Sequence, residues 1–97
     1  LVDGVWRAAV VHIDHFGNIA TNLTRQHLEQ MGADVVVRLR GQELRGLART
    51  FGERPVGELI ALYGSTGNLI VAVVNGNAQT AIQAQVGDEV EVWQMSR

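Results

Sequence analysis

A short stretch near the N-terminus holds most of the side chains that could carry out chemistry. The segment HIDHFGNIATN, residues 12–22, contains two of the three histidines, an aspartate, a phenylalanine and two asparagines. His12 and Asp14 are two residues apart and share one face of a strand, whereas His15 points to the other face. These three side chains could begin a metal site, which needs a further converging ligand. The alternative is a strand-end histidine beside a turn-forming aspartate.

Two other kinds of site can be weighed on the same basis. Ser65 could act as a nucleophile with a histidine and an aspartate, but no serine lies in a nucleophile elbow. Ser65 and Thr66 also lie between two glycines in GSTGN, where backbone N–H groups could form an anion-binding concavity. Similar glycine-containing stretches, FGN, TFGE and VNGNA, occur elsewhere. Ordinary hairpin turns are the competing interpretation of all four.

Composition narrows the class of protein. The 97 residues correspond to one domain, and a hydrophobic content of 46% is that of a globular chain. A net charge of -2 argues against binding nucleic acid through phosphate neutralisation, so the arginines at 38, 40, 45 and 49 indicate a solvated or subunit-contact face. Cysteine is absent, which excludes disulfides and thiolate metal sites. The sequence shows no membrane-length apolar run and no signal-peptide pattern, which favours a cytoplasmic protein.

Hydrophobic periodicity predicts the first elements. We expect a strand at residues 4–13 and an extended run at 19–23. A short helix is expected at residues 24–32, with Thr24 as its N-cap and Gly32 at its C-cap.

The rest of the chain has the pattern of two hairpins and a closing strand. The first hairpin covers residues 34–50, with Gly41 and Gln42 in the turn, and a loop follows at 51–57. The second pairs residues 59–63 with 69–74, and a helical turn is expected at 78–85. A last strand at 86–93 has Val86, Val90 and Val92 on one face. Six or seven short strands predict a mostly β domain, a small antiparallel barrel or sandwich with one or two short helices.

The order of three segments resembles a known family. VHIDHFGNIATNL, then TFGERPVGELIALYGSTGNLIVAVVNGNA, then VGDEVEVW resemble the C-terminal domain of the S-adenosyl-L-methionine (SAM) hydroxide adenosyltransferases. Fluorinating and chlorinating enzymes that act on SAM belong to the same superfamily. The resemblance spans about residues 4–93, and its most specific part is the aspartate followed by FGN and TN.

The resemblance implies an enzyme that is larger than this chain. Residues 1–97 would be a C-terminal β-barrel domain, and the catalytic N-terminal α/β domain would be absent from it. The family converts SAM and water to adenosine and L-methionine without a further cofactor or a metal. It assembles as a homotrimer, with the ligand between this domain and the N-terminal domain of a neighbouring subunit. No membrane or nucleic-acid partner is implied, and the isolated domain is expected to be inactive.

Ligand-holding groups can be placed on this sequence from the same resemblance. Asn18 resembles the asparagine that reads the adenine edge, since an amide offers a donor and an acceptor. Phe51 resembles the aromatic on the adenine face, and Phe16 a wall of that pocket. Main-chain groups of Val73 and Asn75 would also face adenine.

The methionine portion has its own set of expected contacts. Asp14 resembles the aspartate that holds the ammonium group, through a charge-assisted bond. Ser65 resembles the serine that meets the carboxylate, and Thr66 would add its backbone N–H.

Two departures from the family pattern bear on the reaction. Halogenating members resemble SRG where this chain has STG, and they carry a proline before FGN, so hydroxide-type activity is favoured. Many relatives have an aromatic and an acid where this chain has Asn68 and Ile70. The alternative to the enzyme hypothesis is a non-enzymatic β-barrel for binding or oligomerisation.

Overall fold

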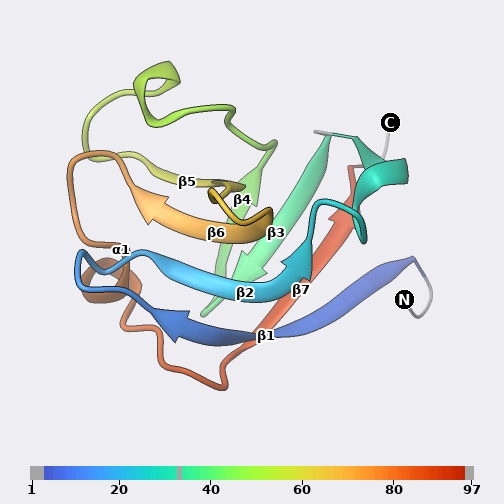
Figure 1. The fold of residues 1–97 in the computed structure, drawn as a ribbon, viewed down its shortest axis with the longest axis horizontal. Coiled ribbons are helices and arrows are strands. Elements are labelled where there is room, and N and C mark those ends of the chain that lie inside the picture. Colours follow the sequence, from blue (N-terminus) through green and yellow to red (C-terminus); the bar gives the residue numbers. More distant parts are fainter. Residues whose placement is uncertain (1–3, 33, 96–97) are drawn as a thin grey trace.

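The fold is a single antiparallel sheet that curls into a nearly closed barrel (Figure 1). The computed structural model describes residues 4–32 and 34–95, without the side chains of Gln30 and Phe51. The strands run in the order β4-β3-β7-β1-β2-β6-β5. Their bounds are β1 Val5–Ile13, β2 Ile19–Thr24, β3 Val35–Leu39, β4 Gln42–Arg45, β5 Leu59–Tyr63, β6 Asn68–Val73 and β7 Glu89–Gln94. Three short helices complete the described part, η1 Glu29–Met31, η2 Phe51–Glu53 and α1 Ala78–Ile82. The predicted fold class is confirmed.

The barrel stops just short of closure between the two end strands. A hydrogen bond from the Ala48 N–H to the Ala61 carbonyl (2.9 Å) ties the segment after β4 to β5. The main core lies inside the barrel, where alternate residues of each strand point. A smaller cluster joins Ala48, from the segment after β4, to Ile60 and Leu62 of β5 and to Ala72 of β6.

The alternation predicted for the first hairpin is confirmed in β3. Val35, Val37 and Leu39 are at most 1% exposed and lie in the main core, while Arg38 on the opposite face is exposed. Val36 lies on the same face as Arg38, yet only 2% of it is exposed.

The helix predicted for residues 24–32 is wrong. Most of this segment is a series of turns, and only the three residues of η1 are helical. Thr24 does act as a cap: its hydroxyl accepts the His27 N–H (3.4 Å), and His27 Nδ1 accepts the Thr24 N–H (3.0 Å). This reciprocal pair closes one turn, as in a capping box. Leu28 and Met31 then pack on the core over too short a length for an α-helix.

The turn of the first hairpin lies one residue earlier than predicted. Leu39 pairs with Gln42, so Arg40 and Gly41 are the turn residues. Both have left-handed backbones, with φ of 52° and 77°. Positive φ at both central positions defines a type I′ turn, whose twist matches that of the flanking strands. Arginine is uncommon at the first position of such a turn, where glycine, asparagine and aspartate are preferred.

Arg40→Asn is therefore expected to stabilise the protein. A left-handed backbone costs most side chains about 1–2 kcal/mol, and asparagine less. The lost ion pair between Arg40 and Asp88 (3.8 Å) is exposed and weak, so the net gain should be a few tenths to about 1 kcal/mol. Urea denaturation measures it. Gly41→Ala is the opposed control and should destabilise by about 1 kcal/mol, since its Cβ meets open space and only the backbone is strained.

The last strand also begins later than predicted. β7 starts at Glu89, and Val86 lies before it in a loop, with 64% of its surface exposed. Val90 and Val92 are fully buried, as expected. Hydrogen bonds between Val10 and residues 87–88 fix this loop. Val86 therefore lies outside the hydrogen-bonded pairing of β7 with β1.

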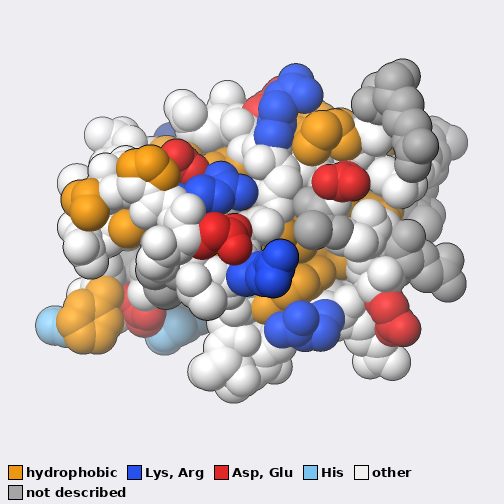
Figure 2. Space-filling view, turned by 90° about the horizontal axis from the view of Figure 1, so that it is seen from above, with side chains coloured by type: hydrophobic (Ala, Val, Ile, Leu, Met, Phe, Trp, Pro, Cys, Tyr) orange, Lys and Arg blue, Asp and Glu red, His pale blue; other side chains and the backbone are white. Residues whose placement is uncertain are grey.

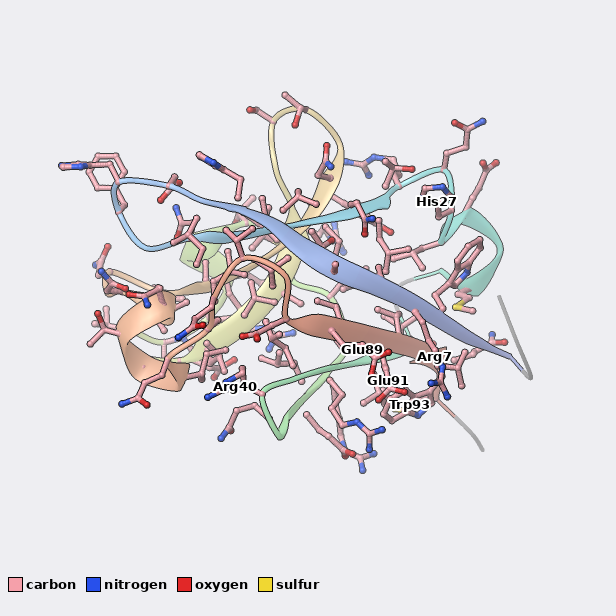
Figure 3. The ribbon with its side chains drawn as sticks, turned by 90° about the horizontal axis from the view of Figure 1, so that it is seen from below. Arg7, His27, Arg40, Glu89, Glu91 and Trp93 are labelled. Carbon is pink, nitrogen blue, oxygen red and sulfur yellow. The ribbon has the colours of Figure 1, made fainter. Side chains whose placement is uncertain are left out.

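Charged side chains of both signs cover the outer face of β1, β7 and β3. Arg38 Nε donates to Glu91 (2.9 Å), and its guanidinium lies 5.3 Å from the centre of the Trp93 ring. Arg7 lies within 4.0 Å of both Glu89 and Glu91 (Figure 3). Arg7 and Arg38 are thus engaged with neighbouring carboxylates.

Candidate functional site

The loop between β1 and β2 is organised by the carboxylate of Asp14. Asp14 Oδ1 accepts the backbone N–H groups of Phe16 and Asn18, each at 2.9 Å. Asp14 Oδ2 accepts one amide proton of the Asn18 side chain at 3.1 Å. These bonds bring Asp14 and Asn18 together and leave the Asn18 side chain one further amide proton. The aspartate therefore forms the turn that composition suggested and orients the amide beside it.

Asp14 is expected to titrate below its ordinary value of 3.8. Burial is the largest single influence and raises the pKa, but the backbone and side-chain hydrogen bonds of Asn18, the Phe16 N–H and the charge of His12 together outweigh it and lower the pKa. Because the pKa is lower in the folded state than in the unfolded state, the ionised carboxylate stabilises the folded protein at pH values above the unfolded-state pKa. This contribution is lost as the pH falls through the folded-state pKa. An NMR titration of the Asp14 carboxyl measures it. Asn18→Ala removes only the side-chain bond and should move the pKa part of the way back toward 3.8. An unchanged value would show that the Asn18 amide does not stabilise the carboxylate.

Gly17 fixes this loop against the start of α1. Its φ is +82°, and a Cβ built on it would lie 2.0 Å from Asn77 Oδ1. Asn77 is the N-cap of α1, and its Oδ1 accepts the Thr80 N–H (2.9 Å). The Gly17 carbonyl in turn accepts the Gln79 N–H (3.0 Å). The β1–β2 loop and the helix N-terminus therefore form one packed unit, which we call the loop end of the barrel.

The chain after β6 joins the loop end. Val74 is bonded to the segment before β5, through its N–H to Glu58 (3.0 Å) and its carbonyl to Gly57 (2.9 Å). Val73 is the last residue of β6 and pairs with Leu59 of β5. The Val73 carbonyl accepts the Gly76 N–H (3.0 Å). Asn75 is exposed, with a left-handed φ of 53°.

Exposed apolar side chains occur at the same end. Phe16 at the tip of the β1–β2 loop is 73% exposed, and Val56 in the loop before β5 is also 73% exposed. Figure 2 shows hydrophobic side chains next to a histidine at the left of the molecule, where Figure 1 places this loop. Phe16 contacts the ring of His15 edge to face, with centroids 5.5 Å apart. For Phe51, the backbone lies in η2, and the position of its side chain is outside the described residues.

Ser65 and Thr66 lie in the turn between β5 and β6. Asn68 holds this turn to β2: its Oδ1 accepts from the Thr66 hydroxyl (3.2 Å) and its Nδ2 donates to the Thr21 carbonyl (2.9 Å). The Thr21 hydroxyl, fully buried, donates to the Leu69 carbonyl (2.8 Å). The threonine of the TN motif and Asn68 thus set where the serine turn lies.

The predicted site residues divide into two groups at opposite ends of the β2–β6 pair. Ile19 pairs with Val71, so Asn18 lies beside the end of β6, together with Asp14 and Phe16. Thr24 pairs with Asn68, so Ser65 and Thr66 lie at the other end of the two strands. The register therefore places the first group near the end of β6 at Val73 and separates it from the serine turn.

The described residues do not form the metal site that the sequence suggested as one possibility. Across residues 4–32 and 34–95, no three histidine, cysteine, aspartate or glutamate side chains are close enough to hold a metal ion. His12 pairs with Ala20 across the β1–β2 hairpin and is exposed. His15 packs on Phe16, and His27 caps the turn described above, so the three histidines serve different local contacts.

Several residues that build the loop end were not expected from the sequence. Gly17 was treated as one turn glycine among many, and Asn77 was not singled out. An asparagine directly before a helical turn is an N-cap signal and could have identified Asn77. Nothing local indicates that these two meet, because they are sixty positions apart in sequence and their contact is set by the pairing of β2 with β6.

Fold and site together define a small antiparallel β-barrel domain with a polar loop end and a separate serine-containing turn. The family model described as the SAM hydroxide adenosyltransferase C-terminal domain matches residues 8–91, and the chain belongs to this family. This confirms the resemblance noted in the sequence.

Relatives with names and structures support the same family. A Thermus thermophilus protein named (R)-S-adenosyl-L-methionine hydrolase is 40% identical over 83 residues, which is 86% of this chain and 30% of the relative. A protein of the same name from Salinispora arenicola is 34% identical over 88% of this chain and 31% of its own length. The chain therefore spans about a third of these relatives. A crystal structure of an uncharacterized conserved protein from Thermotoga maritima superposes with a TM-score of 0.83 at 31% identity, over 97% of this chain and 38% of that one.

Proposed function

We propose that this chain is the adenosine-holding domain of an enzyme that hydrolyses SAM to adenosine and L-methionine. The observation that carries the proposal is the loop end, where Asp14 orients the Asn18 amide beside the end of β6. An adenine edge needs a donor and an acceptor at fixed positions, and an amide held by a neighbouring carboxylate supplies them with little loss of conformational entropy.

The proposed reaction depends mainly on how the enzyme orients the nucleophile relative to SAM. A hydroxide or water oxygen forms a bond to C5′ of SAM as the C5′–S bond breaks, and the electron pair leaves with the methionine sulfur. Because the sulfonium is already a good leaving group, the enzyme must chiefly hold the nucleophile in line and exclude bulk water. We propose that no cofactor or metal takes part and that the water-activating groups belong to an N-terminal α/β domain.

The two groups of site residues suggest how SAM lies on the domain. A ligand that touches Asn18 at one end and Ser65 at the other must extend along the β2–β6 pair. Adenine at the loop end would then place the amino-acid portion toward the serine turn. The ammonium contact expected for Asp14 does not fit this orientation, because Asp14 lies at the loop end with Asn18. That contact stays a separate prediction, which requires the amino-acid portion to lie at the loop end instead. We further propose a cytoplasmic homotrimer in which the N-terminal domain of a neighbouring subunit covers the ligand.

Binding and turnover test different parts of this proposal. In the longest natural polypeptide that contains the chain, we expect adenosine to bind, as measured by calorimetry. We also expect SAM to be hydrolysed, as measured by methionine release. Asn18→Ala should weaken adenosine by about tenfold or more. Gln42→Ala, an exposed amide on β4, is the matched control and should leave affinity unchanged.

The opposing outcomes are distinct. Equal adenosine affinity in the Asn18→Ala protein and the control would remove the adenine role of the loop end. Adenosine and SAM both failing to bind would favour the non-enzymatic barrel. Methionine release by residues 1–97 alone would show that the catalytic groups are not in another domain.

A further inference from the structure

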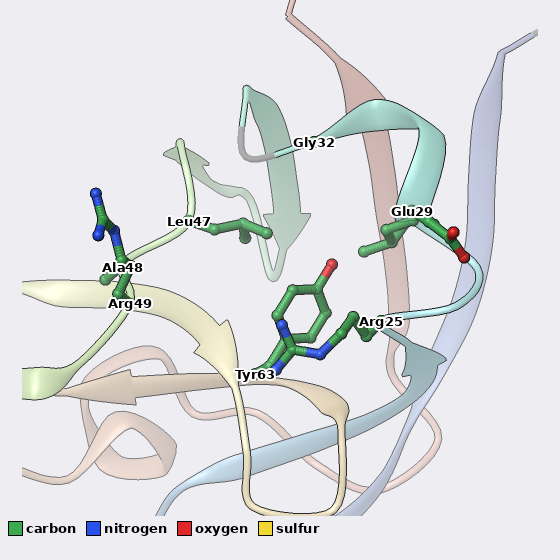
Figure 4. A pocket seen from close by; sticks show the side chains of 8 residues that line it. Arg25, Glu29, Gly32, Leu47, Ala48, Arg49 and Tyr63 are labelled. Carbon is green, nitrogen blue, oxygen red and sulfur yellow. The ribbon is translucent and has the colours of Figure 1, made fainter.

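A cavity opens at the other end of the barrel, where the sheet fails to close. Its volume is about 520 Å³, within the range of small-molecule sites. It lies between η1, the segment after β4 and the end of β5 (Figure 4). Leu28, Leu47 and Ala48 give it an apolar wall, and Arg25 and Tyr63 supply its polar groups.

The charge inside this cavity comes from one arginine that lacks an internal counter-ion. Of the arginines in the described residues, only Arg25 and Arg45 lie beyond 4.0 Å of every described carboxylate. The Arg25 guanidinium lies over the Tyr63 ring, 4.4 Å from its centre. Such stacking holds the planar fork in one orientation and leaves its N–H edge free to donate.

Other polar groups of the lining point elsewhere. Figure 4 shows the side chains of Glu29 and Arg49 directed away from the cavity, while the Tyr63 hydroxyl points into it. Arg49 also lies near Glu53 (4.0 Å). Burial raises the pKa of the Tyr63 hydroxyl, although the charge of Arg25 opposes this, so at neutral pH the hydroxyl is a donor. One cation, one hydroxyl donor and an apolar wall match a monoanion with an apolar body.

We propose that this cavity binds a small monocarboxylate with a short apolar tail, with the carboxylate on Arg25 and the tail against Leu28 and Leu47. A planar guanidinium pairs with a carboxylate through two parallel hydrogen bonds. A single guanidinium is a poor match for a phosphate dianion, and the Glu29 carboxylate at the rim would repel one. Apolar α-amino acids belong to this ligand class, and Glu29 at the rim is compatible with their ammonium group. The site is separate from the loop end. It adjoins the serine turn, because the Arg25 N–H donates to the Gly67 carbonyl (2.9 Å), but neither Ser65 nor Thr66 lines it. Acid binding in this cavity does not require the proposed hydrolase activity.

Matched pairs of probes test the carboxylate requirement. In calorimetric titrations of the longest natural polypeptide containing this chain, L-methionine and pentanoate are expected to bind. L-methioninol and pentanol, which keep the tails but lack the carboxylate, should bind at least about tenfold more weakly. Inorganic phosphate should not compete. Equal binding of each acid and its alcohol, or no binding of either acid, would overturn the proposal.

Variants locate the binding in this cavity. Arg25→Gln should weaken both acids by about tenfold or more, and Tyr63→Phe by a few-fold. Arg45→Gln is the matched control, an exposed arginine on β4 that is likewise unpaired among the described residues. Asn18→Ala should leave acid binding intact, which separates this site from the adenosine pocket. Binding that survives Arg25→Gln but is lost in Asn18→Ala would place the acids at the loop end and overturn the assignment.

Discussion

Gly17→Ala is expected to lower the free energy of unfolding by about 2–4 kcal/mol and to abolish adenosine binding. The left-handed backbone alone costs alanine about 1–2 kcal/mol. The new Cβ would also lie 2.0 Å from Asn77 Oδ1, and moving that side chain breaks the cap of α1, which is worth about 1 kcal/mol. Urea denaturation gives the stability, and adenosine calorimetry gives the effect on the proposed site.

A substitution at a second glycine separates the cost of backbone strain from the cost of the steric clash with Asn77. Gly57 has a φ of +90° and open space around its Cβ, so Gly57→Ala should cost only the backbone term of about 1 kcal/mol. If the two variants were equally stable, the contact between Gly17 and Asn77 would not matter. The double variant Gly17→Ala with Asn77→Ala should recover part of the loss, because the collision is then removed.

Thr21→Val should destabilise the protein by about 1–3 kcal/mol although the side chain keeps its shape. Thr21 is the one buried polar side chain among the described residues. Its hydroxyl donates to the Leu69 carbonyl (2.8 Å) and accepts the Leu23 N–H (3.2 Å). Valine would leave both groups without this partner in a water-free interior. Thermal and urea unfolding measure the change.

Thr21→Ser tests the cause of that loss. Serine keeps the hydroxyl and removes a methyl group, so it should cost about 1 kcal/mol, through packing alone. A larger loss for serine than for valine would show that packing, and not the hydrogen bonds, is what Thr21 contributes.

The strands were predictable because their periodicity is local. Residues 59–63 were assigned to a strand with the bounds that β5 has, and the alternation of Val35, Val37 and Leu39 fixed which face is buried. The helix at 24–32 was mispredicted, since Leu28 and Met31 have helical spacing but a Thr24–His27 capping pair closes the chain into turns. The hairpin turn was misplaced by one residue because Arg40 adopts a backbone that arginine rarely does.

The candidate site was predictable only in part, for a related reason. Asp14 and Asn18 are four residues apart, and their mutual hydrogen bonds follow from a local turn. That Ser65 lies at the far end of β6 from them depends on which strand pairs with which, and sequence patterns do not encode this. The cavity at Arg25 depends on the gap between β4 and β5, the two ends of the sheet order.

The position of β7 has a consequence for how the domain forms. β7 is the last strand of the domain to be synthesised, yet it lies in the middle of the sheet, between β3 and β1. Until it emerges from the ribosome, no strand pairing joins β3 to β1. The sheet then consists of two pieces, β4 with β3 and the group of β1, β2, β6 and β5, which are linked only across the gap between β4 and β5. Each piece exposes an unpaired edge during that interval, to which chaperones or a second nascent chain could bind. Insertion of β7 joins them, so the cooperative core appears in one late step, and folding should be slow because the decisive contacts are distant in sequence.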